Sequence, residues 1–337
     1  MPRTSFLIPV KNGEKTIEVA IRSAMAQTDR DIEIVVINDG STDKTSLIVR
    51  ALSQEDGRVR LYDRPWGGIV SAMNFGLTMC DGKFIARLDA DDQALPRRLE
   101  RQLPLLEADP TLGVVDAEVE MFREDGPVPA GMSHYATWVN SLHDPADFDR
   151  ELLIDSPIIH PAATYRRDVV QNIGGYRDLE HPEDYDLWLR LHAAGYRFRK
   201  VPEVLHRMRD RPERLTRTDP RYSQEAMRSA RQMWLSNTIL SSPKRVIVWG
   251  AGKEGKHWIR WLSACGHHIP AVVDVAERRI GGTRAGSPVI KPEDLPSVTA
   301  DLCLVAVGAR GARSEIRADL ARLRPDWREG EQWWALR

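Results

Sequence analysis

Acidic side chains gather where one mostly apolar segment of the chain ends. Asp89, Ala90 and Asp91 follow the run 83–88, and Asp92 extends the cluster. Alternating carboxylates suit a hard divalent cation, because such ions prefer oxygen ligands and keep part of their water shell. A cation held there can bridge two phosphates and neutralise a diphosphate leaving group. The alternative interpretation is a solvated acidic turn without a ligand.

A second acidic pair opens a predicted helix. Glu183 and Asp184 begin the segment 183–194, in which apolar residues recur at helical spacing. A carboxylate at this position can be the general base that removes a proton from an acceptor hydroxyl. Acidic residues also favour helix N-termini through the helix dipole, so the pair has a purely structural explanation as well.

Two further positions could contribute to a site. Asp39 stands on the tight turn Asp39–Ser41, where its carboxylate can accept a hydrogen bond from an amide-like N–H of a nucleotide base. The same turn could equally be a strand-to-helix connection capped by its own side chains. His160 follows an apolar pair, which is typical of a structural histidine more often than of a catalyst.

The elements that must position these residues alternate between strands and helices. The predicted strands are 5–10, 31–38, 59–62 and 83–88, and the predicted helices between them are 14–27 and one that includes 75–79. Such alternation implies an α/β fold with a largely parallel sheet covered by helices on both faces. Ligands bind beyond the carboxyl ends of strands in such sheets. Val10, Asp39 and Asp89 lie at three such ends.

A glycine-rich segment marks a second predicted domain. Gly250, Gly252 and Gly255 follow the predicted strand 245–249 and open a helix, and Asp274 ends the next strand about 20 residues on. This is the context of a dinucleotide fingerprint, so we expect a small Rossmann-like α/β domain of about three strands that could bind a nucleotide. We predict three parts in chain order: an N-terminal α/β domain (1–220), a helical linker (221–243) and the Rossmann-like domain (244–337).

Composition sets the remaining limits. At 337 residues the chain exceeds the usual ceiling for one hydrophobic core, which favours two domains. The net charge of −1 gives the molecule no electrostatic reason to bind nucleic acid. Three widely spaced cysteines argue against a disulfide framework. With no signal peptide and no apolar run of membrane-spanning length, we expect a cytoplasmic protein, at most peripheral to the inner face of a membrane; a homo-oligomer is compatible.

A series of motifs in order makes the N-terminal two-thirds of the chain resemble the family 2 glycosyltransferases, which have the GT-A fold. The first three similar segments are 6–14, 36–43 and 67–76. The run 88–92 is similar to the metal motif of that family. The acceptor half is represented by 160–161, 174–176 and 183–188.

The resemblance assigns roles to the matching residues. Asp39 would hold the nucleotide base, Asp89 would contact the ribose or the metal, and Asp91 would bind Mn²⁺ or Mg²⁺. Asp184 would be the general base of an inverting, single-displacement transfer, with Glu183 beside it. The other donor contacts expected are Pro9, Val10, Glu14, Gly68 and Ala90.

One segment departs from the family pattern. Many relatives place a histidine that contacts the metal on the strand after the acceptor helix. Here His206 is out of register, and Arg209 stands at the expected position. A guanidinium there could stabilise the leaving diphosphate directly, with weaker metal dependence. The alternative is that Arg209 belongs to a basic surface loop over 209–220.

The resemblance implies an enzyme that moves a sugar from a nucleotide-diphosphate sugar to a hydroxyl of a glycan or lipid-linked acceptor, in the synthesis of a bacterial polysaccharide. A non-catalytic nucleotide-sugar scaffold or sensor is the alternative. Asp91, Glu183 and Asp184 favour the enzyme, because a binder needs no general base. A third hypothesis places a nicotinamide-dependent oxidoreductase in the C-terminal domain.

Overall fold

The computed structural model describes residues 2–309 and 311–336, which form two compact units. The first unit comprises residues 2–148 and 156–230. The second comprises residues 149–155 together with the described residues from 231 onward. The chain therefore passes between the units three times.

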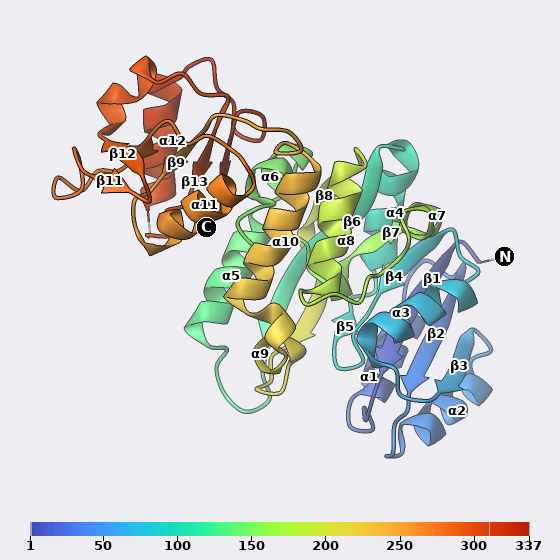
Figure 1. Cartoon of the computed structure of the whole chain (residues 1–337). Helices are drawn as coiled ribbons and strands as arrows, with labels where there is room; N and C mark the ends of the chain where they lie inside the picture. Colours follow the sequence, from blue (N-terminus) through green and yellow to red (C-terminus); the bar gives the residue numbers. More distant parts are fainter. Residues whose placement is uncertain (1, 310, 337) are drawn as a thin grey trace. The chain divides into compact units, whose positions relative to one another are not determined.

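The first unit is built on an eight-stranded sheet in the order β3-β2-β1-β4-β7-β6-β8-β5 (Figure 1). Its parallel part consists of β1 (Thr4–Val10), β2 (Ile32–Asp39), β3 (Val59–Arg64) and β4 (Phe84–Arg87). Every residue of β1 and β2 is buried, as expected of central parallel strands covered on both faces. Because the strands are parallel, Val10, Asp39 and the residues after Arg87 all lie at one edge of the sheet.

The other four strands make the sheet mixed. They are β5 (Gln93–Ala94), β6 (Leu112–Phe122), β7 (Thr164–Arg166) and β8 (Arg197–Arg209). β7 is antiparallel to both β4 and β6, whereas β6 and β8 are parallel. The predicted mixed, mostly parallel α/β sheet is confirmed.

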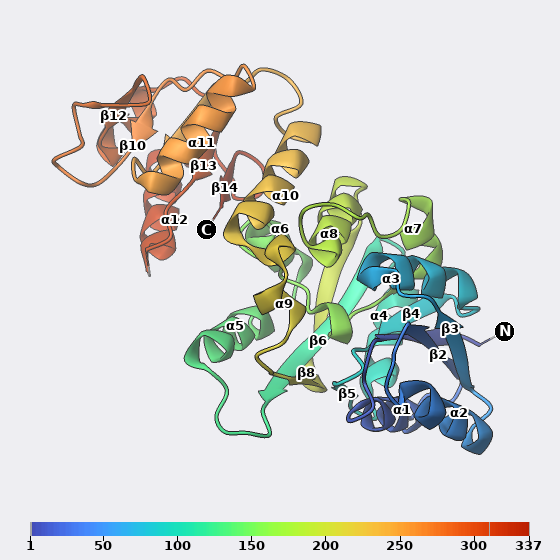
Figure 2. The same cartoon turned by 60° about the horizontal axis from the view of Figure 1, so that its bottom comes forward.

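Helices cover the two faces of the parallel part (Figure 2). One face packs against α1 (Ile17–Met25), α2 (Thr45–Glu55) and α4 (Arg98–Ala108), and its core contains Phe6, Ile8 and Val36. The opposite face packs against α3 (Gly68–Met79). A Cβ at Gly76 of α3 would lie 2.3 Å from Leu7 Cδ1, so glycine permits this close approach.

Further helices follow β6 in the chain, and two of them, α6 (Pro145–Glu151) and α10 (Gln224–Asn237), continue into the second unit. Up to Asn237 they are α5 (Ala130–Asn140), α6, α7 (Arg167–Asn172), α8 (Glu183–Ala193), α9 (Leu215–Thr218) and α10, with 3₁₀ turns η1 (His160–Ala162) and η2 (Pro220–Tyr222). The predicted open loop over 209–220 is partly wrong. β8 continues to Arg209 because it pairs with β6 along its length, and α9 lies within the segment.

The second unit holds a six-stranded sheet in the order β11-β12-β10-β9-β13-β14. Its strands are β9 (Val246–Trp249), β10 (Val272–Val273), β11 (Thr283–Arg284), β12 (Ser287–Ile290), β13 (Leu302–Val305) and β14 (Trp333–Ala335). The prediction of about three strands is wrong. Strands of two to four residues carry too few side chains to give a recognisable period.

Helices α11 (Lys253–Ala264) and α12 (Ala312–Leu323) and the 3₁₀ turn η3 (Pro292–Ser297) complete the second unit. Trp327 and Trp333 are buried in its core beside Ile247. The segment 149–155 contributes the buried Glu151, whose carboxylate accepts hydrogen bonds from Arg313 (2.9 Å) and Arg317 (2.7 Å).

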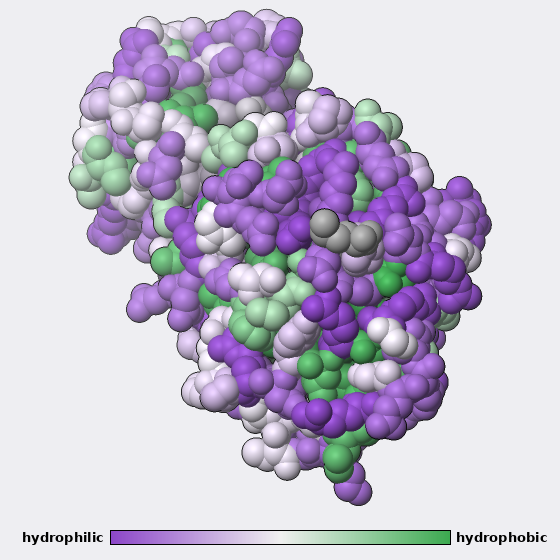
Figure 3. Space-filling view, turned by 90° about the vertical axis from the view of Figure 1, so that its right-hand side faces the viewer, coloured by the Kyte–Doolittle hydropathy of each residue, from purple (hydrophilic) through white to green (hydrophobic). Residues whose placement is uncertain are grey.

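Within the described residues, none of the helices is both long enough and apolar enough to cross a membrane. Figure 3 shows one face of the molecule, on which hydrophilic residues predominate and the hydrophobic ones form small, separate patches. The most exposed large hydrophobic residues include Leu47, Trp66 and Val275.

Candidate active site

Asp39, at the end of β2, is buried and bound by the chain's own backbone. Its two carboxylate oxygens accept hydrogen bonds from the N–H groups of Gly67 (3.0 Å) and Gly68 (2.8 Å). Arg64 Nε lies 3.4 Å from the same carboxylate. Asp39 thereby fixes the N-terminus of α3 at the carboxyl edge of the sheet. Gly68 needs to be glycine for its φ of 81°.

The end of β1 is joined to the loop that follows β2. Pro9 and Val10 are buried and pair with Ile37 and Asn38. Glu14 is exposed, and its Oε2 accepts a hydrogen bond from the N–H of Lys44 (3.1 Å). In this structure, Pro9 and Val10 lie at the ligand edge of the sheet, while Glu14 connects two loops.

The acidic cluster after β4 presents three carboxylates, each with a basic partner. Asp89 accepts from Arg87 Nη2 at 2.6 Å, and Asp91 forms an ion pair with Arg211 Nε at 2.8 Å. Ala90 lies between them and is half-buried.

The third carboxylate, Asp92, turns inward. It contacts His206 Nε2 at 2.9 Å and accepts from the N–H of Arg209 at 2.8 Å. Asp89 and Asp91 are thus the two carboxylates of the cluster that remain part-exposed.

The pKa values of Asp89 and Asp91 are shifted in opposite directions. Burial opposes ionisation of Asp89, but the charges of Arg87 and Arg214 lower its pKa to about 2. Burial and the negative charges of Asp89 and Asp92 raise the pKa of Asp91. Asp91 is therefore a carboxylate in an excess of negative charge, which a bound cation would relieve.

The chemistry of Asp89 and Asp91 fits a hard divalent cation, since both offer carboxylate oxygens. Within the part of the chain that the structure describes, no three or more His, Cys, Asp or Glu side chains converge as a metal-binding group. A cation would therefore rely on these two carboxylates and on oxygens from a ligand or water.

Of the two residues predicted on the leaving-group side, His206 lies inside the core, whereas Arg209 lies beside Asp91. His206 is fully buried, and burial together with the charge of Arg98 lowers its pKa well below the usual value. Arg209 donates from Nε to the carbonyl of Asp91 (3.1 Å) and forms an ion pair with Glu124. Arg211, which the sequence did not single out, is the arginine that reaches the Asp91 carboxylate.

The acceptor-side acids open α8. Glu183 is buried and accepts a hydrogen bond from the Tyr222 hydroxyl at 3.0 Å. Asp184 is half-buried, and its Oδ1 accepts from the N–H of Tyr185 at 2.7 Å. Burial and the charge of Glu183 raise the pKa of Asp184 to about 7. A carboxylate with this pKa can take up a proton near neutral pH.

His160 belongs to a buried aromatic group. Its Nε2 lies 2.8 Å from the hydroxyl of Tyr176, which lies 2.9 Å from the hydroxyl of Tyr165. Its ring packs edge-on against Trp188 of α8. Burial and the charge of Arg87 lower the pKa of His160 well below its usual value, so the ring is neutral. The structural interpretation of His160 fits these contacts.

Arg87 is the residue that sequence reasoning missed. It is the last residue of β4 and only 3% exposed, and its charge is the main cause that lowers the pKa of Asp89. At Asp184 the same charge is outweighed by burial and by Glu183, which raise the pKa. An arginine inside the otherwise apolar run Phe84–Leu88 was the signal that could have revealed it.

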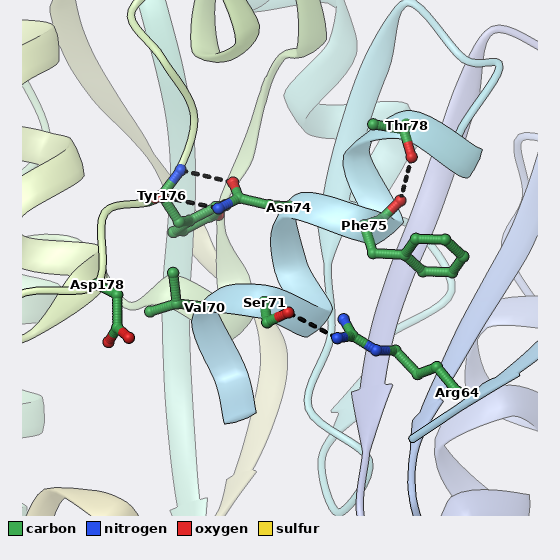
Figure 4. A pocket seen from close by; sticks show the side chains of 8 residues that line it. All are labelled: Arg64, Val70, Ser71, Asn74, Phe75, Thr78, Tyr176 and Asp178. Carbon is green, nitrogen blue, oxygen red and sulfur yellow. Dashed lines mark hydrogen bonds between the residues drawn. The ribbon is translucent and has the colours of Figure 1, made fainter. Parts of the chain in front are cut away.

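A hollow of about 670 Å³ lies along α3 (Figure 4). Arg64 enters it and donates to Ser71 Oγ at 2.6 Å, while Asn74 is held by two hydrogen bonds to the backbone of Tyr176. The remaining lining residues are Val70, Phe75, Thr78 and Asp178. Arg64 connects this hollow to the carboxylate of Asp39.

The glycine loop of the second unit is held by hydrogen bonds and close packing within the unit itself. Gly250 has a φ of 115°, and a Cβ at Gly255 would lie 1.6 Å from the Gly250 carbonyl oxygen, so both positions need glycine. Asp274 accepts from the N–H of Ala251 (2.7 Å) and from Arg279 (2.9 Å) through one oxygen, and from Ala276 N–H (2.8 Å) through the other. Gly252 is the N-cap of α11.

Comparison with known proteins decides the family. Residues 5–174 match the family model described as glycosyl transferase family 2. The chain belongs to this family. Among curated relatives, it is 27% identical over 241 residues to the O-antigen biosynthesis glycosyltransferase WbnJ of Escherichia coli, covering 70% of this chain and 90% of that one.

A second similar relative is the hyaluronan synthase of Pasteurella multocida, 30% identical over 207 residues. That match covers 61% of this chain but only 20% of the synthase, as does the match to the chondroitin synthase of the same species. The family 2 glycosyltransferase fold is thus shared with proteins much longer than this chain.

Two solved structures have a similar fold. Residues 1–349 of Staphylococcus aureus TarS superpose with a TM-score of 0.53 at 20% identity, covering 70% of this chain and 66% of that one. The mannosyltransferase PcManGT of Pyrobaculum calidifontis gives a TM-score of 0.50 at 20% identity, covering 78% and 74%, and its structure contains GDP-mannose and Mn²⁺. The GT-A fold is therefore shown.

Proposed function

We propose that this chain is an inverting glycosyltransferase that transfers a sugar from a nucleotide-diphosphate sugar to an acceptor hydroxyl in bacterial polysaccharide synthesis. The observation that carries the proposal is the contrast between Asp89, whose pKa is lowered to about 2 so that it stays ionised, and Asp184, whose pKa is raised to about 7 as suits a base. The names of similar proteins support it, since they include O-antigen and amylovoran biosynthesis glycosyltransferases.

The donor would bind at the carboxyl edge of β1, β2 and β4. Structures of similar fold contain UDP-GlcNAc or GDP-mannose, which supports a nucleotide-sugar donor. In this proposal, Asp39 and Arg64 would face the base, with Pro9, Val10 and Gly68 lining its pocket. Ala90 and Asp89 would lie beside the ribose and sugar.

A divalent cation, Mn²⁺ or Mg²⁺, would be held by Asp91 and Asp89 and would neutralise charge on the leaving diphosphate. The raised pKa of Asp91 supports a cation at this position. Arg211 and Arg209, beside Asp91, would stabilise the diphosphate from the protein side.

Asp184 would accept the proton. As the acceptor oxygen attacks the anomeric carbon, its hydroxyl proton passes to the Asp184 carboxylate. The bond from that carbon to the diphosphate oxygen breaks, and the nucleoside diphosphate leaves with the electron pair. One displacement inverts the configuration of the carbon. Glu183 would raise the basicity of Asp184 through its negative charge.

For the second unit, we propose a binding or assembly role that leaves the transfer itself to the first unit. The domain division proposed from the sequence, 1–220 and 244–337 joined by a linker, is supported in part by the separate compact unit from residue 231 onward, which also includes 149–155. The internal hydrogen bonds of Asp274 argue against redox use of its glycine loop.

Calorimetric titration with UDP-, GDP- and dTDP-sugars, with and without Mn²⁺, tests the proposed function. Wild type should bind one donor in a metal-dependent way. Asp91→Ala should lose that dependence, while Asp274→Ala, the matched acid of the second unit, should keep it. Binding without turnover in the presence of acceptor glycans would favour the nucleotide-sugar sensor. If none of the donors binds, the assignment of the donor site at the carboxyl edge of β1, β2 and β4 is overturned.

A further inference from the structure

Arg87 combines deep burial with unused hydrogen-bonding capacity. Its side chain donates to Asp89 through Nη2, whereas Nε and Nη1 are buried and have no hydrogen-bond partner among the described residues. Its guanidinium is charged, because arginine is not deprotonated in proteins. Leaving donors of a buried charged group unpaired is costly, typically by more than about 1–3 kcal/mol.

A second buried arginine shows that this fold can satisfy a guanidinium. Arg98 is fully buried, and its Nε, Nη1 and Nη2 donate to Gln102, Pro161 and Ala163. Within the described part of the chain, Arg87 is the one arginine with two unpartnered buried nitrogens. The unpaired donors are therefore particular to Arg87 and point to a ligand.

The surroundings of Arg87 identify which part of a ligand it would meet. Its Nη2 donates to Asp89 at 2.6 Å, and its main-chain N–H donates to the carbonyl of Ala163, which follows the turn that carries His160. Its charge also acts on Glu183 and Asp184. Arg209 and Arg211, in contrast, contact Asp91. In the proposed reaction, the diphosphate lies at Asp91, and the group between Asp89 and Asp184 is the sugar being transferred.

We infer that Arg87 forms a subsite for the transferred sugar, in which its free Nε and Nη1 groups donate hydrogen bonds to sugar hydroxyl oxygens. This inference rests on the proposed function. Because the charges of Arg87 and Asp89 cancel as a pair, neutral hydroxyl oxygens suit the remaining donors better than an additional anion. Arg87 would thereby select among sugars by the presence and position of a hydroxyl group.

The test compares the nucleotide-sugar with the nucleoside diphosphate alone. Arg87→Lys keeps the charge beside Asp89 but removes the planar fork. It should bind the nucleoside diphosphate within twofold of wild type and bind the nucleotide-sugar about 10- to 100-fold more weakly. Arg166→Lys, whose arginine donates only to main-chain carbonyls, is the matched control and should change neither affinity.

Donors with deoxygenated sugars distinguish a sugar contact from a structural role of Arg87, because only a sugar contact makes donor affinity depend on one particular hydroxyl. In wild type, removal of one particular hydroxyl should weaken binding about as much as Arg87→Lys does. In Arg87→Lys, the same deoxygenation should have no further effect, since the two changes remove one interaction. Thermal unfolding of both variants checks that the fold is kept.

Three outcomes would overturn the inference. Equal loss of nucleoside diphosphate and nucleotide-sugar affinity in Arg87→Lys would do so, as would additive losses with every deoxy donor. If the variant fails to fold, the deoxy-donor series with wild type decides alone. Unchanged binding of every singly deoxygenated donor would exclude the subsite. Failure of wild type to bind any nucleotide-sugar is a different result, and it would remove the proposed function itself.

Discussion

The carboxylate of Asp274 in the second unit and the carboxylates of Asp91 and Asp184 in the first unit are held in opposite ways. In the second unit, the carboxylate oxygens of Asp274 accept two backbone N–H groups and an arginine, which outweigh burial and lower its pKa. In the first unit, Asp91 and Asp184 are crowded by other acids, and their pKa values are raised. The arrangement around Asp274 stabilises a loop, whereas the one around Asp91 and Asp184 leaves carboxylates that can bind a cation or a proton.

A sequence motif does not by itself mark a site. The glycine loop of the second unit has the spacing of a nucleotide fingerprint, but its acid is already bound by its own loop. Asp91 and Asp184, in contrast, have raised pKa values because burial and neighbouring acids oppose their ionisation, and a cation or a proton would relieve this opposition. The direction of the pKa shift separates these acids from Asp274 better than residue spacing does.

The largest expected effect comes from removing the proposed base. Asp184→Asn should lower kcat by about 10²- to 10⁴-fold, because the amide cannot take up the acceptor proton. Donor affinity should stay close to that of wild type. Initial rates of nucleoside diphosphate release measure kcat, and calorimetry measures donor affinity. Asp274→Asn is the control and should leave kcat unchanged; a loss below tenfold in Asp184→Asn would contradict the assignment.

The second effect concerns the glycine loop. A Cβ at Gly255 would meet the Gly250 carbonyl at 1.6 Å, whereas one at Gly252 would have no heavy atom within 4 Å. Gly255→Ala should therefore destabilise the second unit by about 1–3 kcal/mol or more, while Gly252→Ala should be tolerated. Differential scanning calorimetry of both variants makes the comparison. Equal stabilities would mean that the loop rearranges freely.

The smallest effect is a pH dependence that should affect only the first unit. Since the pKa of Asp184 is raised to about 7, its base form is lost below that pH, and kcat/KM should fall about tenfold per pH unit between 6.5 and 5.

Asp274 provides the contrast within the same titration. Its pKa is lowered by folding, so its stabilising contribution is present above the usual aspartate range and is lost only as pH falls through the folded-state value. Circular dichroism should thus show a folded protein while the rate falls. A rate independent of pH over this range would argue against Asp184 as the base.

Periodicity predicted much of the first unit. The apolar runs that became β1 and β2, and the helical repeat of α8, were long enough to locate the sheet edge and the acids on it. Three strands of the second unit, β11, β12 and β14, escaped prediction because they have only two to four residues each.

The contacts of the site were less predictable than its elements. Arg87 lies in a strand whose pattern is apolar, and only the structure reveals that two of its donors are unpaired. Arg211 reaches Asp91 from a segment 120 positions away, a proximity that only tertiary folding produces. His206 and Asp92 are paired inside the core for the same reason.

The route of the chain matters for any truncation. Residues 149–155 belong to the second unit although the first unit surrounds them in sequence. A stop codon near residue 230 would remove Arg313 and Arg317, which donate hydrogen bonds to the buried carboxylate of Glu151. Such a truncation would not remove the second unit as a whole, because its residues 149–155 would stay in the remaining chain.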